Sequence, residues 1–373
     1  MPARAEQLRG EVREFLEEER AAGRLRDACD VWLAGHDREF SRRLGARGWL
    51  GMTWPREYGG AERSGLERYV VTEELLAAAA PVASHWVADR QSGPLLLRHG
   101  SEEQRRHFLP PIARGECSFV IGMSEPGAGS DLAAVRTHAV RRGPEWILNG
   151  TKIWTSNAHL ADFAIVLCRT APPGGDRHAD LSQLIVDLRG PGVEIRPILG
   201  MTGEHHFNEL VFVDAPVPAE LLIGGEGDGW SQVTSELAYE RSGPERFLST
   251  FPLLVALVRE LGAEAGESGT VAIGRLVAHL CTLRRLSLGV AARLEAGDDP
   301  AVEAALVKDI GTRFEREVVE LARLNAPAVL SLSSPDRYGA MLAGAVLSVP
   351  GFTLRGGTTE ILRGIVARAL GVR

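Results

Sequence analysis

Two short stretches of the chain combine hydroxyl residues, glycines and a tryptophan, which are residue types that can contact a bound ligand. The first reads VIGMSEPGAGSD at residues 120–131, and the second reads NGTKIWTSN at residues 149–157. Taken singly, Ser124 and Ser156 are typical of turns, and Trp154 is typical of a packed β core. The glycines at 127 and 129 make no dinucleotide fingerprint, because the third glycine and the flanking elements of that motif are missing. Taken together, the two stretches favour a ligand site.

A carboxylate and a guanidinium also stand next to each other in the sequence, at Glu240 and Arg241. Residues 229–242 have a helical hydrophobic period, and neighbouring residues of a helix point about 100° apart, so the two side chains could face different surroundings. A carboxylate in apolar surroundings has a raised pKa and can act as a general base near neutral pH. By itself, a Glu–Arg step on a helix is more often a solvated face or a structural ion pair. Both that interpretation and a general base at Glu240 stay open.

The hydrophobic period divides the chain into three regions that must position these residues. Residues 1–117 are helical, residues 118–226 switch to the period of two that is typical of short strands, and residues 227–373 return to the helical period. We therefore predict an α+β protein with an N-terminal α-helical domain, a middle β domain that is a small antiparallel barrel or sandwich, and a C-terminal four-helix bundle. The elements do not alternate as βαβ units would.

Several elements can be predicted more closely. One face of the first helix carries Leu8, Val12, Phe15, Leu16 and Glu19. Ser101 followed by Gln104 predicts a capping box, and we expect the helix that it opens to stop at Pro110-Pro111. Strands are expected near residues 118–123, 146–149, 163–168, 184–188 and 210–213, and long C-terminal helices at 229–242, 245–264, 270–296 and 301–325.

The composition excludes some classes of protein. With 42 Lys and Arg against 49 Asp and Glu, the net charge of −7 gives no support to nucleic-acid binding. No apolar run approaches the roughly 18 residues that a membrane helix needs, and the charged start lacks the apolar core of a secretion signal, so we expect a cytoplasmic protein without membrane insertion. The cysteines are scattered, which predicts reduced, buried thiols and no metal site; they are Cys29, Cys117, Cys168 and Cys281.

The two stretches resemble the flavin-contacting signatures of the acyl-CoA dehydrogenase family. The resemblance extends to Glu57-Tyr58-Gly59-Gly60 and to GGTTEILRGIVARALG near the C-terminus, so it covers nearly the whole chain. It implies FAD as cofactor. The isoalloxazine ring of FAD must be held flat, with hydrogen bonds to its pyrimidine edge. In the resemblance, Ser124 and the backbone of Met123 hold that edge, Trp154 covers the ring and Ser156 bonds near N5. The other cofactor contacts implied there are Gly129, Thr155, Thr358 and Glu360, and Ser130 would lie between flavin and thioester.

The resemblance also implies α,β-dehydrogenation of an acyl thioester, in which a carboxylate takes the α proton and hydride passes to flavin N5. In many members this carboxylate precedes the Gly-Thr of the C-terminal signature, but Gly356 stands there in this chain. Members similar to the isovaleryl- and long-chain-type enzymes instead carry a glutamate before an arginine on the first long C-terminal helix, which implies Glu240 as the base. Arg241 would then hold the carrier arm or the cavity wall, and a backbone N–H near Gly356 would bond the thioester oxygen.

Two departures from the family pattern bear on partners. The family's frequent aspartate three residues before the arginine is Ala238, so the acyl carrier could be CoA or acyl carrier protein. The Arg-x-x-Phe and Gln-x-x-Gly-Gly segments through which subunits usually touch a neighbour's FAD are missing, which is similar to a branch whose unequal subunits pair. A homo-oligomer is equally compatible. The resemblance alone implies an electron-transfer flavoprotein as acceptor; the alternatives are a flavin oxidase or monooxygenase on the same scaffold, and a non-catalytic partner subunit of a heteromeric enzyme.

Overall fold

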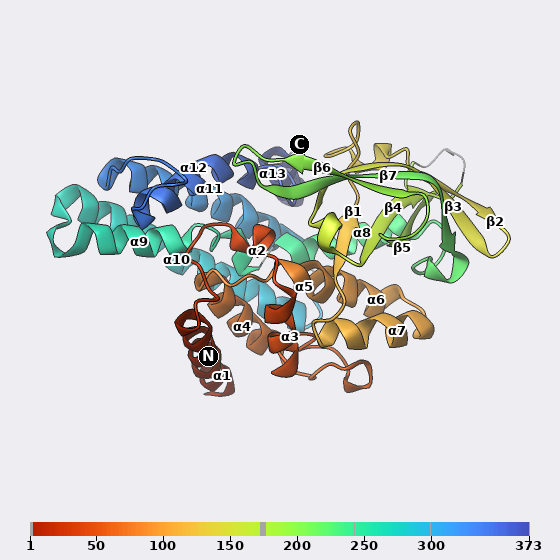
Figure 1. Cartoon of the computed structure of the whole chain (residues 1–373), viewed down its shortest axis with the longest axis horizontal. Helices are drawn as coiled ribbons and strands as arrows, with labels where there is room; N and C mark the ends of the chain where they lie inside the picture. Colours follow the sequence, from red (N-terminus) through yellow and green to blue (C-terminus); the bar gives the residue numbers. More distant parts are fainter. Residues whose placement is uncertain (1–2, 172–176, 242, 299, 373) are drawn as a thin grey trace. The chain divides into compact units, whose positions relative to one another are not determined.

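The computed structural model describes residues 3–171, 177–241, 243–298 and 300–372, and the side chains of residues 236–241 and 264 lie outside that description. Along the chain, helices are followed by a sheet and then by helices again (Figure 1), which confirms the predicted α+β class. The chain folds into two compact units. We call residues 33–63 with 82–237 the sheet unit, and residues 1–32, 64–81 and 238–373 the helical unit.

The sheet unit contains a seven-stranded sheet in the order β1-β4-β2-β3-β7-β6, with β5 paired to β4. Its strands are β1 (Phe119–Gly122), β2 (His138–Arg142), β3 (Glu145–Ser156), β4 (Phe163–Arg169), β5 (Leu181–Asp187), β6 (Val193–Leu199) and β7 (His205–Pro218). Every strand predicted from the sequence is present. The expectation of a purely antiparallel sheet is wrong, because β1 and β2 both run parallel to β4. The chain makes the β2–β3 hairpin and a further reversal before it returns as β4, so β4 re-enters the sheet in the direction of β1.

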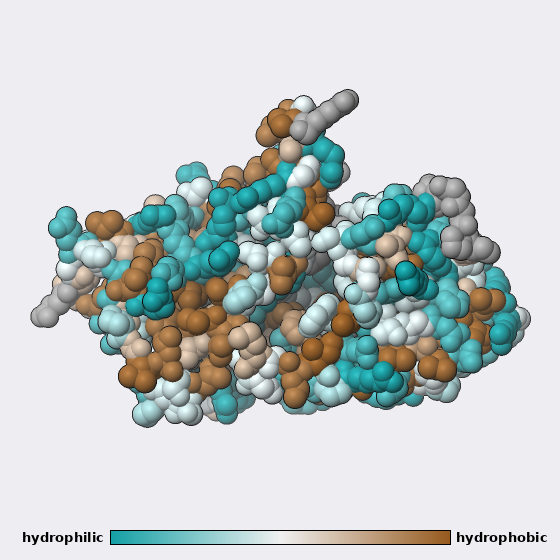
Figure 2. All heavy atoms as spheres, turned by 90° about the horizontal axis from the view of Figure 1, so that it is seen from above, coloured by the Kyte–Doolittle hydropathy of each residue, from teal (hydrophilic) through white to brown (hydrophobic). Residues whose placement is uncertain are grey.

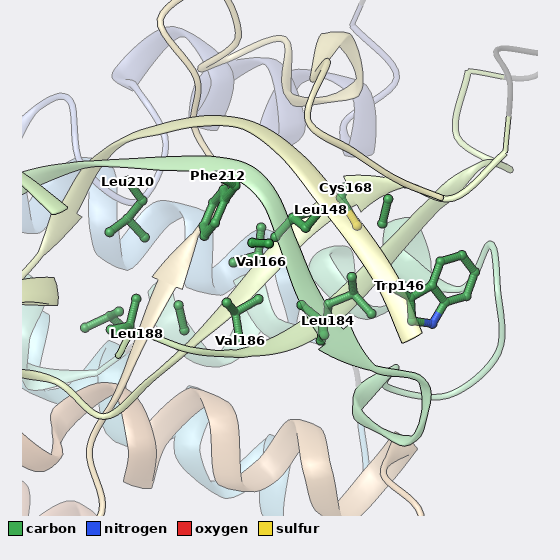
Figure 3. Packing of buried hydrophobic residues seen from close by; sticks show 14 of the residues in the cluster. Trp146, Leu148, Val166, Cys168, Leu184, Val186, Leu188, Leu210 and Phe212 are labelled. Atoms are coloured by element: carbon green, nitrogen blue, oxygen red, sulfur yellow. The ribbon is translucent and has the colours of Figure 1, made fainter. Parts of the chain in front are cut away.

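The strands that lie at the centre of this unit are buried on both faces. In β4, Val166 and Cys168 point into one apolar cluster, where they pack with Trp146, Leu148 and Phe212 (Figure 3). Ile165, one residue out of phase, joins a second cluster formed with helices α6 (Gly93–His99) and α7 (Glu102–Ala113). This alternation gives β4 its continuous apolar sequence, as expected for a strand covered on both sides.

Helix α7 begins as predicted and ends later than predicted. Ser101 and Gln104 form the capping box, but Pro110 and Pro111 lie inside the helix, which continues to Ala113. Each proline removes one backbone donor, yet the next turn still closes, since the N–H of Arg114 donates to the Pro110 oxygen at 3.2 Å. Burial of apolar α7 side chains in the second cluster outweighs the lost hydrogen bonds; they are Phe108, Leu109, Ile112 and Ala113.

The helical unit is built around α11 (Ala301–Asn325), which packs against α9 (Phe251–Leu261), α10 (Gly266–Glu295), α12 (Arg337–Phe352) and α13 (Thr359–Ala369). Helix α1 (Ala3–Ala21) packs on α4 (Gly65–Ala77), and α4 packs on α10. The predicted face of α1 is confirmed as its buried face. The helix predicted at 245–264 is shorter, because α9 starts only at Phe251. Outside this group, α3 (Arg38–Ala46) and α5 (Ala83–Val87) belong to the sheet unit, and α2 (Val31–Ala34) and α8 (Gly229–Arg241) each cross the boundary between the two units along the chain.

Apolar residues and one cysteine lie exposed at the surface. Figure 2 shows groups of apolar residues among polar ones on one face of the molecule, and the side chains of Met201 and Val329 are 81% and 83% exposed. The four cysteines are free thiols, as predicted, but the expectation that all are buried holds only for Cys168: Cys29 and Cys117 are partly buried, and Cys281 is exposed on α10. Within the described ranges, no helix is both long enough and apolar enough to cross a membrane.

Candidate functional site

Met123 and Ser124, two of the predicted ligand contacts, follow β1 and lead into a tight turn at residues 125–128. The backbone N–H of Glu125 donates to the Ala128 oxygen at 2.8 Å, and the N–H of Ala128 donates back to the Glu125 oxygen at 3.0 Å. The turn is tied to β3 because the N–H of Ile153 donates to the Ser124 oxygen at 2.9 Å. The structure therefore brings the first predicted stretch against the second within the sheet unit.

Lys152 fastens this turn from inside the sheet. Its Nζ donates to the Met123 carbonyl oxygen at 3.0 Å and to Glu125 Oε1 at 2.8 Å, and the lysine is fully buried, at 0% exposure. Burial lowers the pKa of the Lys152 ammonium, and the Glu125 carboxylate opposes that shift. Burial would raise the pKa of Glu125, but the Lys152 ammonium and the N–H groups of Thr137 and Arg136 outweigh it and lower that pKa.

Strand β3 is bulged twice, once in each half of the predicted NGTKIWTSN stretch. The first register shift lies at Leu148/Gly150 and the second at Lys152/Thr155. Gly150 has φ +143°, and a Cβ there would collide with Thr137. The second bulge puts Trp154 in the left-handed region at φ +63°, a conformation that a bulky residue rarely adopts. Bulges of this kind re-aim side chains and are frequent beside active sites.

The ring of Trp154 is exposed rather than buried in the core. It is 55% exposed, and its one aromatic contact among the described residues is edge-to-face with Phe207, with ring centroids 5.6 Å apart. A large indole that is both strained and exposed is poorly explained by core packing, because a core position would bury it. The prediction that Trp154 contacts a ligand is therefore preferred over the β-core alternative, which the exposure contradicts.

The end of β3 is held by a polar network that the sequence did not reveal. Asn208 donates from Nδ2 to the Thr155 oxygen at 2.9 Å, and its Oδ1 lies 2.7 Å from His205 Nε2 and 3.2 Å from His159 Nδ1. The two imidazoles stack with centroids 3.8 Å apart. Burial and then the His205 imidazole lower the pKa of His159. No motif marks these residues, because they come from β7 and from the turn after β3.

Strand β3 carries a buried hydroxyl without a hydrogen-bond partner, and the glycines of the first predicted stretch border open space. The side chain of Thr155 is 1% exposed, and its Oγ1 has no hydrogen-bond partner among the described residues. A Cβ added at Gly127 or Gly129 would meet no atom within 4 Å, and Ser130 next to them is exposed. An unpaired buried hydroxyl, a displayed indole and a glycine loop beside free space fit a planar polar ligand such as the isoalloxazine. In the described part of the chain, no group of three His, Cys, Asp or Glu residues could hold a metal.

The C-terminal signature forms a glycine turn before α13. Gly356 and Gly357 have φ +66° and +96°, and Thr358 caps α13 by accepting a bond from the Ile361 N–H at 3.4 Å. Lys308 of α11, 1% exposed, donates from Nζ to the Gly357 oxygen at 2.8 Å. Glu360 is exposed in the first turn, where its own N–H and the Thr358 hydroxyl lower its pKa. The positive φ values explain two glycines in a row.

Arg355, directly before this turn, is tied to the N-terminal segment of the helical unit. Its Nη1 and Nη2 donate to the two carboxylate oxygens of Asp30, each at 2.7 Å. Its guanidinium carbon lies 4.9 Å from the ring centroid of Trp32 and 4.5 Å from that of Phe352. This pair has no signature in the sequence, since 325 positions separate its members.

A buried carboxyl group lies behind this pair. Glu315 of α11 is 2% exposed and accepts a bond from the Ser249 N–H at 2.8 Å. Burial raises the pKa of Glu315 to about 7, although the Arg355 guanidinium and the bonds from Ser249 oppose that shift. The helical unit therefore holds a carboxyl group that titrates near neutral pH and that sequence reasoning missed.

The predicted base and its neighbour lie on α8. The helix expected at 229–242 is present from Gly229 to Arg241, and residue 242 lies outside the described residues. In its first turns, Val233 and Trp230 belong to an apolar cluster with Leu167 and Leu181, within the sheet unit. The side chains of Glu240 and Arg241 lie outside the described residues, so their assignment stays a prediction.

Comparison with known proteins agrees over nearly the whole chain. Residues 2–116, 120–215 and 268–371 match the family models for the N-terminal, middle and C-terminal domains of acyl-CoA dehydrogenases. Acyl-CoA dehydrogenase IpdE1 of Mycobacterium tuberculosis is 36% identical over 347 residues, which cover 90% of this chain and 88% of that protein.

Two solved structures resemble the whole chain. The one described as Tcur3481-Tcur3483 steroid ACAD is 32% identical with a TM-score of 0.86, over 100% of this chain and 98% of that one. The ChsE4-ChsE5 complex from Mycobacterium tuberculosis is 31% identical with a TM-score of 0.85, over the same shares.

Proposed function

Because the chain belongs to the acyl-CoA dehydrogenase family, we propose that it oxidises the Cα–Cβ bond of an acyl thioester with Glu240 as the base. The family membership makes it an FAD-dependent oxidoreductase. The observation that best supports a working flavin site in this chain is the bulge of β3, which holds Trp154 at φ +63° with its ring 55% exposed. Strain of this kind persists only where the surrounding structure enforces it.

The residues around this bulge are proposed to hold the cofactor. Ser124 and the Met123 backbone would bond the pyrimidine edge, Trp154 would cover the ring, and Thr155 and Ser156 would bond its polar atoms. The unpaired Thr155 Oγ1 supports this, since a buried hydroxyl without a partner costs free energy until a ligand satisfies it. Gly129 would let the loop approach the cofactor closely, and Thr358 and Glu360 would add contacts from the C-terminal turn. When bound, FAD supplies the acceptor for the hydride that leaves Cβ.

The chain's own residues would handle the proton and the developing charge. Glu240, in the last turn of α8, takes the proton from Cα and becomes a neutral carboxylic acid. A backbone N–H near Gly356 would bond the thioester carbonyl oxygen and stabilise the enolate-like charge that forms as Cα loses its proton. Ser130 lines the region of the thioester, and Arg241 holds the carrier arm. Gly356 leaves no second carboxylate at the position where other members carry their base.

We also propose a substrate class and an assembly for this enzyme. The likeness to a structure named as a steroid ACAD supports a bulky, ring-bearing acyl group as the first substrate to test, carried by CoA or by acyl carrier protein. The names of both similar structures join two different proteins, which supports a heteromer with a sister subunit, with a homo-oligomer as the other possibility. We further propose domain boundaries near residues 117 and 226, a cytoplasmic location, and an electron-transfer flavoprotein that reoxidises the enzyme.

Anaerobic titration of the purified holoenzyme with a panel of acyl-CoA and acyl-carrier thioesters tests the function. A competent thioester should bleach the flavin absorbance of the wild type, and Glu240→Gln should stay yellow and folded without bleaching. Glu226→Gln is the matched control, because Glu226 is an exposed carboxylate outside the proposed machinery. Bleaching of the Glu240→Gln protein at the wild-type rate would refute the assignment of the base.

The same preparation separates the two alternatives. Reduced enzyme that reacts rapidly with oxygen would indicate an oxidase or monooxygenase. A chain that is colourless alone and gains flavin only when a sister chain is added would indicate a non-catalytic subunit.

A further inference from the structure

The chain has almost no lysine. Of its 42 basic residues only Lys152 and Lys308 are lysines, so the other 40 are arginines. Lysine is ordinarily a surface residue, yet these two are 0% and 1% exposed. Solvent-exposed positive charge in this protein is therefore carried by arginine, and the two lysines serve some other purpose.

Both lysines bind the backbone in the same way. Lys152 donates to the carbonyl oxygen of Met123 at 3.0 Å in the sheet unit, and Lys308 donates to the carbonyl oxygen of Gly357 at 2.8 Å in the helical unit. Each carbonyl belongs to a peptide whose N–H is that of the next residue, Ser124 or Thr358. Those two residues are among the ones assigned above to the cofactor.

Arginine would not serve equally well at these positions. An ammonium is a compact point charge on a flexible stem, whereas a guanidinium is a wide planar fork. The stem of Lys152 runs through a narrow space, because a Cβ on Gly122 would lie only 3.3 Å from Lys152 Cγ. In a chain that otherwise uses arginine throughout, a compact cation at two buried carbonyls points to a geometric requirement.

We propose that Lys152 and Lys308 are positioning residues that hold and polarise the Met123–Ser124 and Gly357–Thr358 peptides for FAD. This inference rests on the proposed function. A cation that donates to a carbonyl oxygen draws charge through the amide and strengthens the N–H of the same peptide as a donor. Lys152 also brings positive charge close to the peptide assigned to the pyrimidine edge, where reduced flavin carries its negative charge.

Flavin affinity and potential test the proposal. A hydrogen bond to a charged group contributes about 1.5–3 kcal/mol, so Lys152→Met and Lys308→Met should each weaken FAD binding to apoprotein by up to about 10- to 140-fold. Lys152→Met should also make the midpoint potential of the bound flavin more negative, whereas Lys308→Met should not. Lys152→Arg should fail to restore the affinity. The control Arg196→Met removes an exposed cation that pairs with Glu194 and Glu209 and should change neither quantity.

A double variant separates positioning from folding. Lys152→Met alone leaves Glu125 buried without its cation, which could unfold the sheet unit. Lys152→Met with Glu125→Gln removes both charges and should keep the wild-type circular dichroism while still binding FAD weakly. The proposal is overturned if that double variant, or both single variants, bind FAD with wild-type affinity.

Lysine-selective ¹⁵N labelling gives a readout independent of activity, because the sequence holds only two lysines. Both side-chain signals should shift when FAD is added to apoprotein, and two unmoved signals with FAD bound would also overturn the proposal. Wild-type protein that binds no FAD at all would instead overturn the proposed function.

Discussion

The ion pair between Asp30 and Arg355 offers the sharpest stability prediction. Asp30 lies at φ +59°, a conformation that asparagine tolerates, so Asp30→Asn removes the charge with little change in shape. The two side chains are 14% and 20% exposed. Removal of one partner from a buried pair costs about 3–5 kcal/mol, and the residual exposure places this variant near the lower end, at about 3 kcal/mol.

The loss of unfolding free energy caused by Asp30→Asn should depend on pH, because both members of the pair influence the pKa of the buried Glu315. Its pKa is about 7 in the folded protein, and the charge of Asp30 helps to raise it, so Asp30→Asn should lower that pKa. An acid whose pKa is raised on folding contributes stability at low pH that is lost as pH rises through the folded value. The wild type therefore loses more stability than Asp30→Asn between pH 6 and 8, and the deficit of the variant should shrink over that interval.

Urea unfolding followed by tryptophan fluorescence measures this, with Trp32 against Arg355 as a local reporter. Asp27→Asn is the matched control, since Asp27 pairs with Arg20 in an ion pair whose side chains are 42% and 51% exposed and which should contribute less than about 1 kcal/mol. At pH 6, where Glu315 is mostly neutral, Asp30→Asn with Arg355→Met should recover most of the loss, because no buried charge is left alone. Equal, pH-independent effects of Asp27→Asn and Asp30→Asn would refute the reasoning.

Three further predictions concern other parts of the chain. The buried His85 has a pKa lowered to about 3, mainly by burial; it stays neutral when folded and protonates when unfolded, so its own contribution to the unfolding free energy should fall by about 1.4 kcal/mol between pH 7.5 and 5.5. In denaturation experiments at the two pH values, the unfolding free energy of wild type relative to His85→Gln should therefore fall by about that amount. Gly129→Ala should leave the melting temperature of apoprotein unchanged, because the added methyl meets open space, but should weaken FAD binding in a fluorescence titration; unaltered binding would remove Gly129 from the site. Trp154→Gly should be more stable than Trp154→Ala by about 1 kcal/mol in thermal unfolding, since only alanine is strained at φ +63°; the usual order, with alanine more stable, would show that the bulge relaxes.

The order of domains and many local features could be predicted from the sequence because they depend on short-range chemistry. The buried face of α1 follows from helical spacing, and the capping box at Ser101 follows from two residues three positions apart. The continuous apolar run of β4 identified a strand without showing that its two neighbours β1 and β2 would run parallel to it. Strand direction depends on the path between strands, which hydrophobic period does not encode. Pro110 and Pro111 misled for a related reason, since the packing of Phe108 and Ile112 on the sheet outweighs a local signal.

The candidate site was predictable as a list of ligand-facing residues, and what supports those residues was not. Ser124 and Trp154 belong to recognisable stretches, but the groups that fix them act through contacts without a sequence signature. Lys152 lies inside the second stretch, and its role emerges only when its Nζ is found on the carbonyl oxygen of Met123, 29 positions earlier. The conformation of Trp154 depends on a bulge, which inserts a residue relative to β7 and therefore belongs to the pairing of two strands and not to either sequence. A motif thus identifies the residues that touch the ligand. In the proposal, the affinity and potential of the flavin also depend on buried charged residues that hold those contacts in place. Variants of Lys152 therefore test the proposed site more severely than variants of Ser124.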